Sequence, residues 1–291
     1  MSFQWTELPA SFQDRVTGKL DFLTRTRLSQ TCHAERKRFN LEQHELEYLM
    51  VFGEANSMLT VIVKEKGHEE EFEFRITNAD WSQNQKNMVK VLFEKSSSIE
   101  HLTLDTCPEE LLRNVTKHCL NITKLTCMDL TGCCEKEVIA RCDESKLLTF
   151  ETFSVKSASF QFNLLTPEFV KRVEVINIHN LTQFGIPAVI ACKWIEHDVG
   201  VGKKLQFSTK SPLVEEFFKF QFGEGMTESH DNGCIILKMK CSDKKIAIIM
   251  EQKLEETYFY VMRVLPGNIH SAEIAEWLQP DLDLLTSNGI W

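Results

Sequence analysis

A short apolar motif recurs from residue 98 onward, and it restricts the chain to architectures built by stacking strands. Each copy places apolar residues at alternate positions, as a β-strand with one buried face does. One position in each copy can be aligned as equivalent, and the intervals are 23, 23, 28 and 29 residues. The aligned residues are Leu102, Leu125, Leu148, Ile176 and Leu205. A unit of this size cannot bury its apolar side alone, so successive units must pack against one another.

The stretches that follow these strands have the character of short helices. They are CPEELLRNVTKHC, CCEKEVIARC, TPEFVKR, IPAVIACKWIEH and SPLVEEFFKFQF, and most carry a proline near the first helical position, where its missing N–H is harmless. A strand followed by a helix at this spacing is typical of leucine-rich repeats. The repeat is irregular and lacks the consensus asparagine ladder, so an ordinary open α/β sheet remains the alternative.

Strand-like segments flank the repeat on both sides. LEYLMVF, MLTVIVKE and EEFEFRI come before it, and GCIILKMKC, KKIAIIMEQ and TYFYVMRV come after it. The later group predicts an antiparallel meander that covers the open edge of the repeat sheet, because an uncovered edge invites unwanted pairing. The expected fold class is α/β (α+β): three N-terminal helices, then an irregular leucine-rich-repeat-like strand/helix domain closed by an antiparallel β meander.

The helical segment at residues 5 to 40 differs from everything that follows it. Phe12, Val16 and Leu20 recur at intervals of four, as one face of a helix does, and a later turn carries Leu28. A segment of some 35 residues is smaller than the roughly 40 residues that a self-sufficient core needs. Its apolar faces therefore require a partner surface, either on this chain or on a second protein.

The order of residues in this segment resembles the F-box. That family has a Leu-Pro pair that opens a helix, an aliphatic ladder ending in Leu-Asp, and then a helix of Arg, Leu and small residues. The matching positions here are Leu8, Pro9, Val16, Leu20, Asp21, Leu28 and Cys32. With Trp5 ahead of the Leu-Pro pair and Arg25-x-Arg27 further on, the segment is most similar to the large F-box families of nematodes.

The resemblance implies a substrate-recognition subunit of an SCF-type (Skp-cullin-F-box) ubiquitin ligase, with residues 1–42 as the F-box. The residues that it implies for binding the Skp-type adaptor are Leu8, Pro9, Phe12, Val16, Leu20, Leu23 and Leu28. Residues 43–291 are similar in layout to the FTH domain that follows many nematode F-boxes, although another F-box-associated domain fits nearly as well. The implied partners are the Skp-type adaptor with its cullin complex and a protein substrate.

A different class of protein also fits the N-terminal segment. In that alternative the chain is a protein-interaction scaffold or inhibitor outside any ligase, and the N-terminal helices are an end cap on its own repeat. Exposure of the apolar face between residues 8 and 28 separates the two hypotheses. An open face favours adaptor binding, whereas a face buried against residues 45 to 110 favours the cap.

Composition narrows the class of partner. The formal net charge is −9 with acidic residues spread along the chain, which argues against a nucleic-acid partner. No apolar run approaches the roughly 20 residues of a membrane-spanning helix, so no membrane partner is expected. The start of the chain has no signal-peptide pattern, so the ten cysteines are expected to be reduced, in the cytoplasm or nucleus.

The motifs of catalysis and metal binding are missing from the sequence. The cysteines between residues 107 and 142 contain no CxxC pair and several occupy apolar repeat positions, which indicates buried thiols and no zinc site. GEGMTE and DVGVGKK lack the frame of a phosphate-binding loop, and no GxSxG occurs. We therefore expect a protein that is not an enzyme and holds no cofactor or metal.

The target-binding residues are predicted from strand periodicity. Strand positions that point inward are committed to packing, so a partner must contact the alternate positions. On one sheet face these alternates form a mixed polar strip, and its predicted target-binding members are His101, Lys124, Glu151, Asn177, His179 and Gln206.

Overall fold

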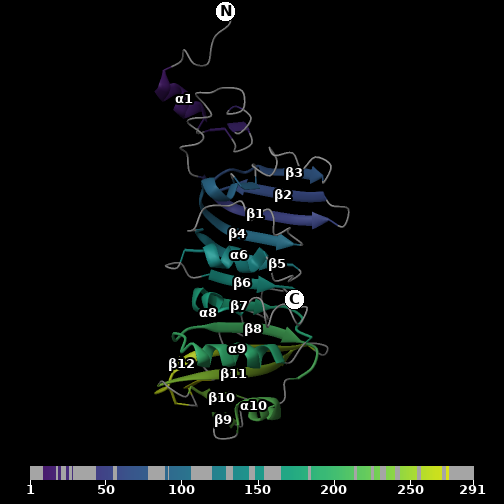
Figure 1. The fold of residues 1–291 in the computed structure, drawn as a ribbon, viewed down its shortest axis with the longest axis vertical. Helices are drawn as coiled ribbons and strands as arrows, with labels where there is room; N and C mark the ends of the chain where they lie inside the picture. Colours follow the sequence, from purple (N-terminus) through teal and green to yellow (C-terminus); the bar gives the residue numbers. More distant parts are fainter. Residues whose placement is uncertain are drawn as a thin grey trace, which may run out of the picture.

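A twelve-stranded mixed β-sheet dominates the computed structural model of this chain (Figure 1). The strand order across the sheet is β3-β2-β1-β4-β5-β6-β7-β8-β12-β11-β10-β9. The structure describes residues 9–17, 19–20, 24–25, 28, 44–54, 58–77, 89–90, 92–105, 120–128, 134–143, 148–153, 165–182, 185–212, 215–223, 226–229, 234–239, 243–253, 257–270 and 273–274.

The strands divide into three groups along the sheet. The first is an antiparallel group of β1 (His44–Glu54), β2 (Met58–Glu65) and β3 (Glu71–Thr77). The second is a parallel group of β4 (Ser96–Asp105), β5 (Ile122–Cys127), β6 (Leu148–Thr152), β7 (Val173–Ile178) and β8 (Lys204–Thr209). The third is an antiparallel group of β9 (Thr227–Ser229), β10 (Ile235–Lys238), β11 (Lys244–Lys253) and β12 (Thr257–Pro266).

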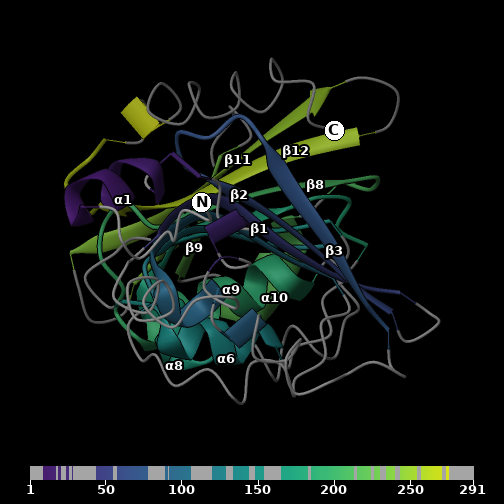
Figure 2. The same cartoon turned by 90° about the horizontal axis from the view of Figure 1, so that it is seen from above.

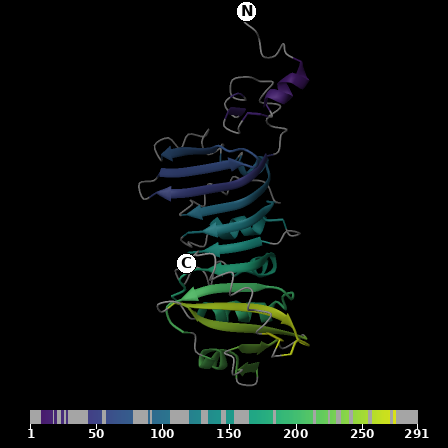
Figure 3. The ribbon, with the colours of Figure 1, turned by 180° about the vertical axis from the view of Figure 1, so that it is seen from behind.

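These groups join without a break. Strand β1 pairs in parallel with β4, and β12 pairs in antiparallel with β8. The chain from residue 44 to residue 266 therefore contributes its strands to one continuous sheet, which Figure 3 shows from the side opposite the helices.

The helices that follow the parallel strands cover one face of this sheet. They are α6 (Cys134–Arg141), α8 (Pro167–Arg172), α9 (Gly185–Glu196) and α10 (Glu215–Phe222), and Figure 2 shows all four on the same side. Helix α8 begins as its sequence predicts, with Pro167 in the first turn and the Thr166 hydroxyl accepting a hydrogen bond from the Phe169 N–H at 3.2 Å. No helix in the described ranges is long and apolar enough to cross a lipid bilayer.

The inward face of the parallel strands forms the main core. In register across the sheet lie Leu102, Leu125, Phe150, Ile176 and Leu205, and all five are buried. The sequence alignment used Leu148 for the third strand, and the structure replaces it with Phe150, two residues further on. Both residues lie on the same face because strand side chains alternate with a period of two, so apolar spacing could not distinguish them.

A second, smaller core lies over the C-terminal meander. It contains Cys234, Ile236, Ala247, Ile249, Val261, Leu265 and Ile274, with Ile269 packed at its margin. Val261 and Met262 are consecutive in β12, and Met262 belongs to the main core. Because consecutive strand residues face opposite ways, this small core lies on the sheet face opposite the helices.

The predicted fold class is wrong. The sequence predicted an N-terminal three-helix F-box followed by an irregular leucine-rich-repeat-like strand/helix domain, whereas the structure is mostly one mixed sheet with few and short helices. Among the described residues before β1, the only helix with defined ends is α1 (Ala10–Thr17). The strand and helix spacing misled the prediction because an open sheet and a solenoid both stack such units.

Candidate target-binding face

The face opposite the helices presents a polar strip along the parallel strands. In register across it lie Thr103, Thr126, Glu151, Asn177 and Gln206, one from each strand from β4 to β8. The neighbouring row begins with His101 and Lys124, which are also in register. We use the name polar strip for His101, Lys124, Thr126, Glu151, Asn177, His179 and Gln206. The register therefore places the six residues predicted for target binding on one face.

Exposure varies along the strip without following the strand order, since Thr126 on β5 is buried and Asn177 on β7 is half-buried. His101 on β4 is exposed, the Lys124 side chain is 30 % exposed, and Gln206 on β8 is buried. Glu151 and His179 are also buried, which the sequence could not predict from alternation alone. The strip members that a partner can reach are therefore His101, Lys124 and Asn177.

Glu151 is the centre of a hydrogen-bonded network on this face. Its Oε2 atom lies 2.7 Å from Lys124 Nζ and accepts a hydrogen bond from the Thr126 hydroxyl at 3.1 Å. Its Oε1 atom lies 3.2 Å from His179 Nε2. A carboxylate only accepts hydrogen bonds, so Nε2 of His179 carries a proton and donates it. Two side chains from β5 and one that follows β7 thus hold one carboxylate in place.

The charge of this carboxylate is secured by its neighbours. Burial alone would raise the pKa of Glu151, but hydrogen bonds from His179 and Lys124, with the positive charge of Lys124, outweigh it and lower the pKa from 4.5 to about 2. Glu151 is therefore ionised throughout the physiological range. The network is a fixed, oriented set of charges, with Lys124 as the member nearest to solvent.

Sequence reasoning missed the apolar neighbours of the network. The Phe153 ring stacks on the His179 ring with centroids 4.3 Å apart and an interplanar angle of 8°. Met128, just beyond the end of β5, is 40 % exposed although it is a large apolar side chain. Met128 and Phe153 each lie two residues after a strip residue, Thr126 and Glu151. Extending the period-two pattern past the strand ends would have found both.

The predicted adaptor-binding residues are only partly described. Pro9 is exposed, and Val16, Leu20 and Leu28 are half-buried. Leu8, Leu23 and the side chain of Phe12 lie outside the described part of the chain. Helix α1 stands beyond the β3 end of the sheet in Figures 1 and 3. The described positions between residues 8 and 28 therefore decide neither hypothesis.

The described cysteines have the environment of structural thiols. Cys127, Cys142 and Cys234 are buried, and burial raises the pKa of Cys142 to about 12 and that of Cys234 to about 11. Cys107, Cys119 and Cys133 lie outside the described residues. Within the described ranges, no group of three or more His, Cys, Asp or Glu side chains could hold a metal ion.

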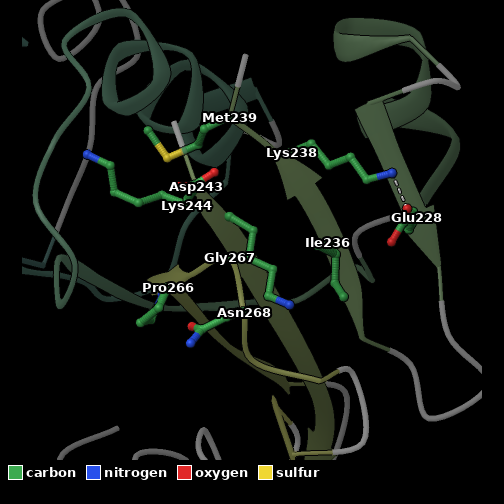
Figure 4. A pocket seen from close by; sticks show the side chains of 10 residues that line it. Glu228, Ile236, Lys238, Met239, Asp243, Lys244, Pro266, Gly267 and Asn268 are labelled. Carbon is green, nitrogen blue, oxygen red and sulfur yellow. Dashed lines mark ion pairs between the residues drawn. The ribbon is translucent and has the colours of Figure 1, made fainter. Parts of the chain in front are cut away.

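A cavity of about 820 Å³ lies at the loop end of the meander, between β10 and the β11–β12 pair (Figure 4). Three lysines line it, and each has a partner. Lys238 pairs with Glu228, Lys244 Nζ lies 2.8 Å from Asp198 Oδ1, and Lys245 donates to the Ile269 carbonyl. Two of the three lysines thus pair with carboxylates, and the third holds a backbone carbonyl, so these contacts are structural.

Comparisons with known proteins identify no family for this chain. The chain matches no protein-family description, no curated protein and no solved structure. Its function must therefore be inferred from its own residues and geometry.

Proposed function

We propose that this protein is a non-catalytic receptor that brings a protein target to an SCF-type ubiquitin ligase. In this proposal the segment before residue 43 binds the Skp-type adaptor, and the polar strip binds the target. The observation that carries the proposal is the separation of two surfaces. Helix α1 stands beyond one end of the sheet, and the strip lies on the face of β4 to β8 opposite α6, α8, α9 and α10.

The N-terminal segment and the polar strip support the proposal in different ways. For the N-terminal segment the support is the F-box-like order of residues, with α1 beginning directly after the Leu-Pro pair. For the strip the support is the fixed network around Glu151. Its charges are already oriented, so a partner can bind them with little loss of side-chain entropy. Such a receptor acts in the cytoplasm or nucleus and contributes proximity, because it raises the effective concentration of the target beside the ligase.

Replacing Leu8 and Pro9 together by alanine in the full chain is expected to weaken binding to a purified Skp-type adaptor. A buried leucine anchor contributes on the order of 2 kcal/mol or more, and proline fixes the backbone at the start of the helix. Affinity is measured by isothermal calorimetry, and thermal unfolding is recorded for the same samples.

The matched control is Phe220→Ala, which truncates an apolar side chain on α10, at the opposite end of the sheet from α1. It should bind the adaptor as the unmodified chain does. Wild-type affinity in the Leu8→Ala, Pro9→Ala variant would contradict the adaptor proposal.

A second candidate function is favoured by one contact. Arg25 forms an ion pair with Glu65 at the end of β2, which fastens the N-terminal segment to the sheet. This contact suits a protein-interaction scaffold or inhibitor whose first residues are an end cap. The same Leu8→Ala, Pro9→Ala variant separates the two, since a cap predicts a melting temperature several degrees lower for the whole protein and no adaptor binding by the unmodified chain.

A further inference from the structure

Three side chains from distant parts of the sequence meet at the joint between the N-terminal segment and the sheet. Arg25 comes from the N-terminal segment, His44 opens β1, and Glu65 ends β2. Their side chains are 10 %, 2 % and 9 % exposed. Arg25 Nη2 donates to Glu65 Oε1, and the same nitrogen lies 3.2 Å from His44 Nδ1. A buried ion pair therefore joins the segment to the sheet.

The ring nitrogen of His44 faces two partners with opposite requirements. A guanidinium group only donates hydrogen bonds, so Nδ1 must offer a lone pair to Arg25. A carboxylate only accepts, so the contact of 3.1 Å between Nδ1 and Glu65 Oε1 requires a proton on Nδ1. One proton thus decides whether His44 bonds to Arg25 or to Glu65.

We propose that Arg25, His44 and Glu65 form a proton-sensitive latch that holds the segment around residue 25 against the sheet and loosens on acidification. With a neutral His44, the guanidinium bridges both partners. When His44 is protonated, its Nδ1–H donates a hydrogen bond to Glu65. The imidazolium then places a second positive charge 3.2 Å from Arg25. Proteins commonly use histidine protonation as a switch of this kind.

The other groups at the joint act on Glu65. His68 Nε2 lies 3.6 Å from Glu65 Oε2, the carboxylate oxygen that Arg25 does not contact. Burial would raise the pKa of Glu65, but the hydrogen bond with His44 and the charge of Arg25 lower it below 4.5. The stabilisation that goes with a lowered carboxyl pKa is complete above about pH 4.5 and is lost only below it, so Glu65 stays ionised between pH 7.5 and pH 5.5. In that range the proton on His44 is what changes the bond to Arg25.

The latch would add regulation to the proposed receptor. This added role rests on the proposed function. A held segment keeps a bound adaptor at a fixed distance from the polar strip, whereas a released segment does not. The latch itself can be tested without an adaptor or a target, so its failure and the failure of the receptor proposal are distinguishable.

The test is hydrogen exchange by mass spectrometry on the full chain at pH 7.5 and pH 5.5, corrected for the intrinsic pH dependence of exchange. At pH 7.5, Arg25→Gln should speed exchange in peptides spanning residues 9–28 by on the order of tenfold or more, because it removes the buried ion pair between the segment and the sheet. Peptides from β4 and β5 should not change. Equal exchange in Arg25→Gln and the unmodified chain would overturn the latch.

Two histidine variants test the proton dependence. At pH 5.5 the unmodified chain should exchange faster in residues 9–28, toward the rate of Arg25→Gln. His44→Gln retains an oxygen acceptor for Arg25 but does not titrate, so it should lose this acid response. His68→Gln should keep it, because His68 contacts Glu65 and lies outside the bond to Arg25. An acid response that persists in His44→Gln would overturn the role of His44.

Discussion

Phe150→Ala is expected to lower the free energy of unfolding by about 3–5 kcal/mol, the range for deleting a fully buried aromatic side chain. Phe150 lies in the middle of the core row between Leu125 and Ile176 and is fully buried. Its ring also meets Phe169 of α8 edge to face, with centroids 5.3 Å apart. The substitution therefore removes a contact between the sheet and its helix layer as well as apolar area.

Phe220→Ala is the matched control, since it is the same chemical change on a side chain that is 88 % exposed. Urea unfolding followed by circular dichroism should show a lower midpoint for Phe150→Ala. For Phe220→Ala the free energy of unfolding should change by no more than about 0.5 kcal/mol. Equal effects of the two substitutions would mean that Phe150 does not occupy the core of the sheet.

Glu151→Gln is expected to destabilise the fold by about 3–5 kcal/mol at pH 7, as breaking a buried ion pair does. The substitution removes the charge that Lys124 Nζ meets at 2.7 Å and leaves that ammonium on the strip without its carboxylate. Glutamine has nearly the same shape as glutamate, so the loss reports charge and hydrogen bonding.

The contribution of Glu151 to stability depends on pH in a predictable direction. The pKa of Glu151 falls from 4.5 to about 2 on folding, so its contribution is present above about pH 4.5 and is lost as pH falls toward 2. The stability difference between the unmodified chain and Glu151→Gln should therefore shrink between pH 5 and pH 2.

Unfolding in urea at pH 7, 4 and 3 measures this difference. Glu100→Gln serves as the control, because Glu100 pairs with Lys66 at the exposed surface and its replacement should change little. A constant difference at all three pH values would show that Glu151 is not held ionised by its neighbours.

The sequence predicted the buried rows better than the architecture around them. Alternation along each strand placed Leu102, Leu125 and Leu205 on the core face because period two is imposed by the pleat. It could not show that β1 pairs in parallel with β4, since that pairing joins residues about 50 positions apart with no local signal. The meander at residues 44–77 therefore became part of one sheet that the repeat spacing did not predict.

At the candidate site, too, the sequence predicted some features and not others. Alternation determines the face on which each side chain lies, so the strip from His101 to Gln206 could be assigned to one face from the sequence. Burial could not, because it depends on what packs over each strand, and Glu151 and His179 proved to be buried. The Arg25 contact was also out of reach, since a lone arginine carries no periodic signal for a partner 40 residues away.

The central claim is that two separate surfaces bind two separate partners. Quantitative affinity purification with mass spectrometry tests it with the full chain, a chain without residues 1–42, and Lys124→Glu combined with Glu151→Lys. The double reversal keeps one opposite-charge pair at the two positions but removes the acceptor of Thr126 and His179, so thermal unfolding of the same samples must show that the fold is retained.

The account predicts that the Skp-type adaptor and cullin are lost only when residues 1–42 are removed. Proteins bound as targets should be lost only from the double reversal, and crosslinks to them should avoid the helix side, for instance Glu196. Adaptor recovered with the shortened chain, or an unchanged set of targets with crosslinks on Glu196, would contradict the account.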